Sequence, residues 1–155
     1  MMFAYIPLRA GEILHANVLR GIANQTVQLH VLAVSMEPLL CVGREHSINN
    51  TRHKLQSIAR TDRHGGDYVL LIDSDVAIES KDAVERMVNA LEYDPSLVAA
   101  CAKTKDDGYA DHVVTSCAVV RRSHWDVIRY LDNPDECQCR KVALLGPVKT
   151  VGGII

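Results

Sequence analysis

The chain has 155 residues, a length typical of one globular domain, and its 48% hydrophobic and 23% charged residues exclude a disordered or fibrous protein. A formal net charge of −2 and a pI near 6.4 provide no basic field for a polynucleotide, so no nucleic-acid partner is expected. No apolar run reaches the ~18 residues that cross a bilayer, and no signal-like core precedes Arg9 and Glu12. We therefore expect a cytoplasmic protein without a transmembrane segment.

The first part of the chain alternates between strand-like and helix-like segments. Residues 3–8 are apolar and predict a strand, and residues 12–24 carry an apolar side chain at every fourth position, which predicts a helix. Residues 27–34 predict a second strand. After a looser loop, Ser47 is expected to cap a second helix.

The next segment is a continuous apolar run at residues 68–72, which is typical of a strand buried on both faces of a parallel sheet. Asp73 and Asp75 follow it directly. A helix from about residue 80 to 93 and a strand at 97–102 complete a βαβαβαβ order. This order predicts an α/β fold with a mainly parallel central sheet and helices on both faces, whose ligands bind at the carboxyl ends of the strands.

The last third of the chain departs from this alternation. A polar loop is expected at residues 104–111, a strand at 112–120 and a short helix at 123–131. A further helix at 137–145 and a final strand at 148–151 are predicted around a Gly-Pro break. The five cysteines are odd in number and two lie in strand-like runs, so we expect reduced thiols and no zinc site.

Asp73-Ser74-Asp75 is the strongest candidate site, because it stands at the end of the buried strand. Mg²⁺ and Mn²⁺ prefer oxygen ligands and complete their shells with water and phosphate oxygens, so two carboxylates can hold such a cation. The alternative interpretation is an ordinary polar exit from a strand.

The motifs resemble, in order and over nearly the whole chain, those of GT-A-type glycosyltransferases, particularly the family-two group. Residues 66–75 read G-D-Y-V-L-L-I-D-S-D and closely resemble the motif G-x-Y-I-x-F-L-D-S-D. Pro7 ends the first strand as in the family, and Gln25 ends a segment that resembles L-x-S-x-x-x-Q. Residues 50–53 stand where the family often has A-R-N, and residues 117–125 resemble its strand running into R-R-x-x-F.

This resemblance implies a metal-dependent, inverting transfer of a sugar from a nucleotide-diphosphate sugar to an acceptor hydroxyl. It implies a single GT-A domain over residues 1–155, with a donor half at about 1–103 and a short or truncated acceptor half at about 104–155. The residues implied in nucleotide-sugar binding are Pro7, Glu37, Arg52, Asp73, Ser74 and Asp75.

Within that set, Asp73 and Asp75 are the implied metal ligands, with Mn²⁺ or Mg²⁺ as the cofactor, and Asp75 is the first choice. Glu37 is the one residue after the second strand that could replace the family's usual acidic pair. Asp135 and Glu136 are the candidates for the catalytic base, and an ordinary surface loop is an equally good interpretation of their segment.

Two other functions remain open from the sequence. Asp73 could be the nucleophile of a haloacid-dehalogenase-like phosphatase, although that motif usually opens a chain. A non-catalytic GT-A relative that only binds nucleotide is the second alternative. Arg121 and Arg122 are interpreted as solvated surface residues rather than phosphate ligands. The sequence leaves open the donor, the oligomeric state and whether the acceptor is a glycan, a lipid or a protein.

Overall fold

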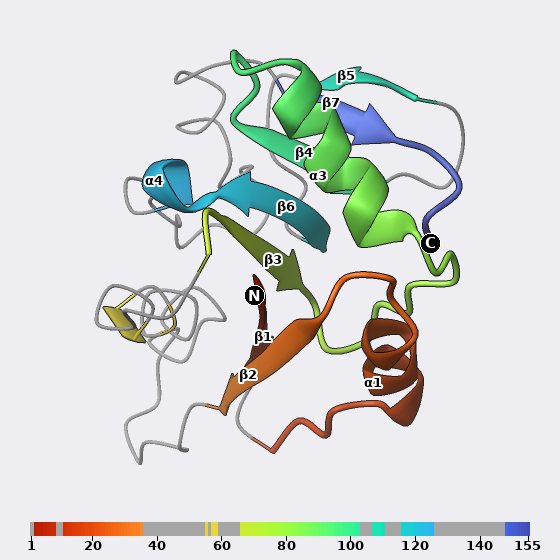
Figure 1. Ribbon diagram of the computed structural model, residues 1–155. Coiled ribbons are helices and arrows are strands. Elements are labelled where there is room, and N and C mark those ends of the chain that lie inside the picture. The colour runs from red at the N-terminus through yellow and green to blue at the C-terminus, as the bar shows by residue number, and fades with distance from the viewer. Residues whose placement is uncertain are drawn as a thin grey trace.

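The protein is described by a computed structural model, which covers residues 2–8, 11–35, 55, 57–58, 66–102, 107–110, 116–125 and 148–155. Within these residues, seven strands form one mixed sheet in the order β2-β1-β3-β6-β4-β7-β5 (Figure 1). The strands are β1 (Met2–Leu8), β2 (Leu29–Ser35), β3 (Tyr68–Ile72), β4 (Ala99–Ala102), β5 (Gly108–Ala110), β6 (Cys117–Arg121) and β7 (Val148–Val151).

The strand directions confirm a mainly parallel sheet. β1 pairs in parallel with both β2 and β3, and β4 pairs in parallel with β7. β6 lies antiparallel between β3 and β4, and β5 lies antiparallel on β7. β1, β2, β3, β4 and β7 therefore run one way, and β5 and β6 run the other way.

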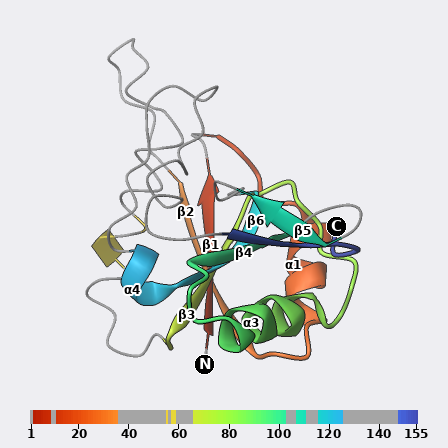
Figure 2. The ribbon, with the colours of Figure 1, turned by 90° about the horizontal axis from the view of Figure 1, so that it is seen from above.

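Helical elements cover both faces of the sheet, as expected. α1 (Ala16–Ala23) and α3 (Ala83–Tyr93) lie on one face, and α4 (Arg122–Trp125) lies on the other (Figure 2). On the second face Trp125 packs against Tyr5 of β1, with their ring centroids 4.6 Å apart, and Leu55 belongs to the same buried cluster.

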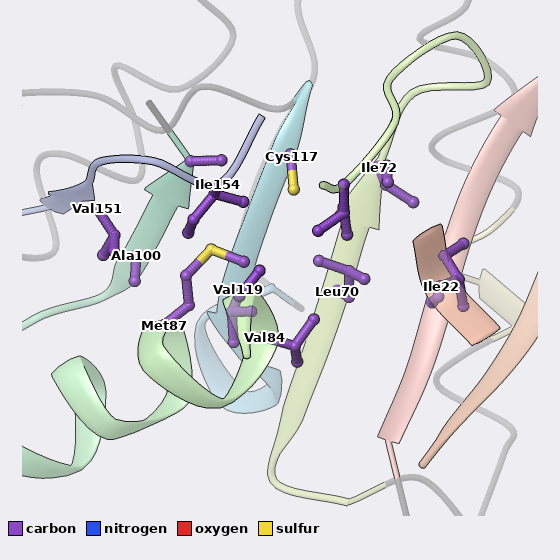
Figure 3. Packing of buried hydrophobic residues seen from close by; sticks show 14 of the residues in the cluster. Ile22, Leu70, Ile72, Val84, Met87, Ala100, Cys117, Val119, Val151 and Ile154 are labelled. Carbon is purple, nitrogen blue, oxygen red and sulfur yellow. The ribbon is translucent and has the colours of Figure 1, made fainter. Parts of the chain in front are cut away.

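β3 lies inside the sheet, between β1 and β6. Leu70 and Ile72 belong to the cluster under α1 and α3, whereas Val69 and Leu71 belong to the cluster on the opposite face, and all four are no more than 5% exposed. Figure 3 shows the first cluster, in which Leu70 lies among side chains from α3 and β6. The prediction of a strand buried on both faces is confirmed, because its side chains alternate between the buried clusters on the two faces.

Two boundary predictions were wrong for physical reasons. The first helix begins at Ala16 rather than at residue 12, since Glu12 accepts a hydrogen bond from Ser74 and His15 is extended, with φ −69° and ψ 135°. The loop expected at 104–111 includes strand β5, because the edge of β7 offers it a ladder of hydrogen bonds.

Other predictions were confirmed or fall outside the described residues. Strand 148–151 matches β7, and the two described cysteines, Cys101 and Cys117, are free and buried. The helix expected from Ser47 is described only at residues 55 and 57–58, and residues 137–145 lie outside the description. No helix among the described residues is long and apolar enough to cross a membrane.

Candidate functional site

The Asp73-Ser74-Asp75 segment leaves the sheet in a tight turn at the carboxyl end of β3. The backbone N–H of Asp73 donates to the carbonyl of Ser116 at 2.9 Å, which adds one more bond to the ladder between β3 and β6. The N–H of Val76 then donates to the carbonyl of Asp73 at 3.2 Å and closes the turn. We call residues 73–75 the aspartate turn. Its main chain is therefore anchored to the sheet.

The aspartate turn lies where the strand order reverses. β2 and β3 flank β1 on opposite sides, so the chain leaves β1 toward one edge of the sheet and β3 toward the other, and ligands of such sheets bind at the carboxyl ends of strands at this position. Tyr5 pairs with Leu71, and continuing this parallel register by two residues places Pro7 beside Asp73. The structure thus brings Pro7 and the aspartate turn, which the sequence assigned to one site, to the same rim.

The three side chains of the aspartate turn differ in exposure. Asp75 is exposed and Asp73 is partly buried, while Ser74 is only 4% exposed. The hydroxyl of Ser74 donates to a carboxylate oxygen of Glu12, which lies in the connection between β1 and α1. Ser74 therefore links the connection after β3 to the connection after β1.

Glu12 is a residue of this rim that the sequence analysis did not include. It follows Gly11, whose φ of +74° turns the chain between β1 and α1. An acidic residue in the connection after the first strand was the available signal, but only the pairing of β1 with β3 places it beside Ser74.

The carboxylates at this rim fit a hard divalent cation that takes most of its ligands from water and phosphate oxygens. The described residues contain no group of three or more His, Cys, Asp or Glu side chains that could hold a metal. Asp73 and Asp75 supply two carboxylates, which suffices for Mg²⁺ or Mn²⁺ when water and phosphate oxygens complete the shell. A metal held by protein groups alone does not fit the described part of this site.

A buried thiol lies under the same rim. Cys117 of β6 pairs with Ile72, and its burial raises its pKa to about 12 from 9.0, with the negative charges of Cys101 and Asp73 acting in the same direction. The thiol therefore stays protonated at neutral pH. It serves as apolar packing beneath the aspartate turn rather than as a nucleophile or metal ligand.

The opposite rim, at the amino end of β3, holds a different set of charged groups. Because β6 is antiparallel, Arg121 stands beside Tyr68. Its guanidinium donates to the Tyr68 hydroxyl at 3.0 Å and to the carbonyls of Leu91 and Leu97. Arg121 is thus a part-buried structural residue, not a solvated one, and it lies far from the aspartate turn along β3. We call Tyr68, Glu92 and Arg121 the arginine network.

Two surface hollows also lie at this opposite rim. Their volumes are about 320 and 530 Å³, and neither is lined by a residue of the aspartate turn. Both share Asp67 and Tyr68, and the larger one adds Glu92 and Arg121. Since ligands of such sheets bind at the carboxyl ends of the strands, these hollows are not the candidate site.

Four of the predicted site residues lie outside the described part of the chain. They are Glu37, Arg52, Asp135 and Glu136. Their roles therefore remain predictions, as do those of Pro7 and the aspartate turn in binding a ligand.

No protein-family model matches the chain, and no curated protein matches it in sequence. Solved structures do resemble it. A197 from STIV has a TM-score of 0.66 at 10% identity, over 99% of this chain and 82% of that one. The mannosyltransferase PcManGT from Pyrobaculum calidifontis, in complex with GDP-Man and Mn²⁺, has a TM-score of 0.62 at 13% identity, over 98% of this chain.

This chain spans 54% of the length of that mannosyltransferase. At such low identities the likeness establishes the fold alone. The chain is a single α/β domain with a GT-A-like, glycosyltransferase-like fold.

Proposed function

We propose that this chain is a metal-dependent glycosyltransferase, which binds a nucleotide-diphosphate sugar at the carboxyl ends of β1 and β3. One observation carries the proposal: the aspartate turn follows the central strand at the point where the strand order reverses. The likeness to a mannosyltransferase bound to GDP-Man and Mn²⁺ supports it, because that protein places a sugar nucleotide and a divalent cation on a similar fold.

The proposed roles follow from exposure and position. Asp75 is exposed and is the proposed ligand of Mn²⁺ or Mg²⁺, while the partly buried Asp73 contacts the ribose or a metal-bound water. When bound, the cation supplies charge stabilisation for the departing nucleoside diphosphate. The Ser74–Glu12 hydrogen bond joins the connections after β3 and β1, and Pro7 is proposed to line the binding site beside Asp73.

The remaining assignments concern residues outside the described part of the chain. Glu37 and Arg52 are proposed to contact the base, the ribose or the diphosphate in a donor half at about residues 1–103. In the acceptor half, at about 104–155, Asp135 or Glu136 is proposed to take the proton of the attacking acceptor hydroxyl in an inverting transfer.

The proposal is tested by titrating GDP-mannose, and then UDP- and dTDP-sugars, with and without Mn²⁺. We expect donor binding to need Mn²⁺ and Asp75→Asn to weaken it on the order of 10–100-fold, since a charged contact contributes roughly 1.5–3 kcal/mol. Asp67→Asn is the matched control, because Asp67 is an exposed aspartate at the other end of β3.

The outcomes separate the alternatives. Donor binding that needs no metal and survives Asp75→Asn would contradict the proposal. Metal-dependent binding without sugar transfer or sugar-nucleotide hydrolysis would identify a non-catalytic relative. Turnover of a generic phosphate ester that Asp73→Asn abolishes would identify a phosphatase instead.

A further inference from the structure

The connection between the aspartate turn and α3 is shaped by other parts of the molecule. Residues 76–80 form no helix or strand, and residues 81–82 form a turn before α3. A segment of this kind has few backbone hydrogen bonds of its own, so its path depends on whatever packs against it. Because Asp75 leads directly into this connection, the same contacts set where the aspartate turn sits.

The first contact comes from α1. A Cβ atom built on Gly21 would lie 2.7 Å from the carbonyl oxygen and 2.9 Å from the nitrogen of Ile78, so the bare backbone of the helix touches the connection. Ile78 is itself buried, at 4% exposure. The connection therefore lies directly on the α1 backbone, three residues after Asp75.

The second contact is made by the side-chain amide of Gln25, just beyond α1. Its Nε2 donates to the carbonyls of Gly21 and Ser80, each at 2.9 Å. Its Oε1 accepts from the N–H of Val84, in the first turn of α3, at 3.1 Å. Asp82, at the start of that helix, makes no capping hydrogen bond with its side chain. Gln25 therefore links α1, the connection and the amino end of α3.

Two neighbouring contacts complete the support. The N–H of Thr26 donates to the carbonyl of Lys81 at 2.9 Å, and the N–H of Glu79 donates to the carbonyl of Ile154 at 3.0 Å. Ile154 is fully buried. Each of the four residues from 78 to 81 is thus contacted by α1, by the residues that follow α1, or by the segment after β7.

We propose that Gln25 is a positioning residue for the aspartate turn: its amide holds the backbone of the connection so that Asp75 presents its carboxylate to the cation. The inference rests on the proposed function. Only an amide supplies the two donors and one acceptor that the three contacts require, because a glutamate lacks the donors and a leucine lacks both. Ligand groups must be held within about 0.5 Å for a productive site.

The test measures binding of Mn²⁺ alone, and of Mn²⁺ with GDP, from the electron paramagnetic resonance signal of free Mn²⁺. We expect Gln25→Leu and Gln25→Glu to weaken Mn²⁺ binding by about 10-fold, the lower end of the effect of removing groups that orient metal ligands. Gln28→Leu is the matched control and should bind as the wild type does, since Gln28 is an exposed glutamine three residues further on.

A second control separates positioning from stability. Val18→Ala removes buried apolar volume from α1, where Val18 is 1% exposed, without touching the Gln25 contacts. We expect it to lower the free energy of unfolding while leaving Mn²⁺ affinity unchanged in the folded protein. Gln25→Glu keeps the acceptor for Val84, so it carries the test if Gln25→Leu does not fold.

Failure of the positioning role can be distinguished from failure of the proposed function. Wild-type Mn²⁺ affinity in folded Gln25→Leu or Gln25→Glu, with affinity lost in Asp75→Asn, would overturn the positioning role and leave the proposed function standing. An equal loss of affinity in Val18→Ala would also overturn it. A wild-type protein that binds no Mn²⁺ even with GDP would overturn the proposed function, and the inference with it.

Discussion

The two rims of the sheet use charged side chains in opposite ways. At the amino end of β3, the arginine network satisfies its own members, since Tyr68 donates to Glu92 and accepts from Arg121, which also binds two backbone carbonyls. At the carboxyl end, the main chain and the Ser74 side chain are held, and Asp75 is exposed to solvent. One rim thus uses its charged groups within the fold, whereas the other leaves the Asp75 carboxylate exposed to solvent.

Surface shape alone points to the rim of the arginine network and not to the proposed site. The two hollows described above lie at the rim of the arginine network, yet its charges already bind one another and the backbone. The proposed site follows from the strand order, because ligands of such sheets bind at the carboxyl ends of the strands. Comparing the two rims predicts that substitutions in the arginine network affect stability, whereas substitutions in the aspartate turn affect ligand binding.

The largest effect is expected from Arg121→Met, which keeps much of the side-chain volume but removes every donor. The free energy of unfolding should fall by about 2–4 kcal/mol, because part-buried carbonyls and the Tyr68 hydroxyl lose a charged partner. Urea unfolding measures this loss. Mn²⁺ and donor binding should not change in the folded protein, and a loss of binding would break the distinction between the rims.

Gly21→Ala is expected to lower stability less than Arg121→Met does, and to weaken Mn²⁺ binding as well. Its methyl group would meet the Ile78 backbone at 2.7 Å, so α1 or the connection must shift, at a cost of about 1–3 kcal/mol. Because that connection starts at Asp75, Mn²⁺ affinity should fall too. Leu19→Ala, at a 41% exposed position of the same helix, is the control for both measurements.

The smallest effect concerns the pH dependence of stability, through Cys117. The folded pKa of Cys117, about 12, lies above the ordinary 9.0. Its contribution to the free energy of unfolding is therefore complete below pH 9 and is lost as pH rises toward 12. Tyr68 acts in the same direction, since burial and then Glu92 raise its pKa as well. Unfolding in urea from pH 8 to 10.5 should show a shallower decline for Cys117→Ala than for the wild type.

Chemical labelling tests the burial of Cys117 directly. Iodoacetamide at pH 8 should label Cys117 slowly in the native protein and rapidly in urea, with peptide mapping to separate it from the other cysteines. Rapid native labelling would mean that the thiol under the aspartate turn is accessible and that the rim is open below the carboxylates.

The sequence was informative where a pattern reports local burial. The apolar run at 68–72 predicted a strand covered on both faces, and β3 has those bounds. The alternation of strands and helices likewise predicted the α/β class, because a parallel strand needs a helical crossover. Asp73 and Asp75 could be placed at a carboxyl end for the same reason.

Contacts between distant segments could not be read in this way. Nothing in the periodicity indicated that β6 would insert antiparallel between β3 and β4, or that Arg121 would therefore face Tyr68. Glu12 likewise reaches Ser74 across 62 positions of sequence. Such contacts depend on strand order, which is decided by the packing of the whole sheet and not by the side chains of any one segment.

The sequence by itself therefore determined strand β3, the fold class and the position of the two aspartates at the strand end, because burial and turn formation depend on consecutive residues. Tertiary structure alone decided which distant residues contact the connection that follows those carboxylates. Gln25 reaches Ser80 across 55 positions, and Glu79 is fixed by Ile154. A backbone positioned accurately enough for a metal ligand requires distant segments to pair their hydrogen-bond donors and acceptors.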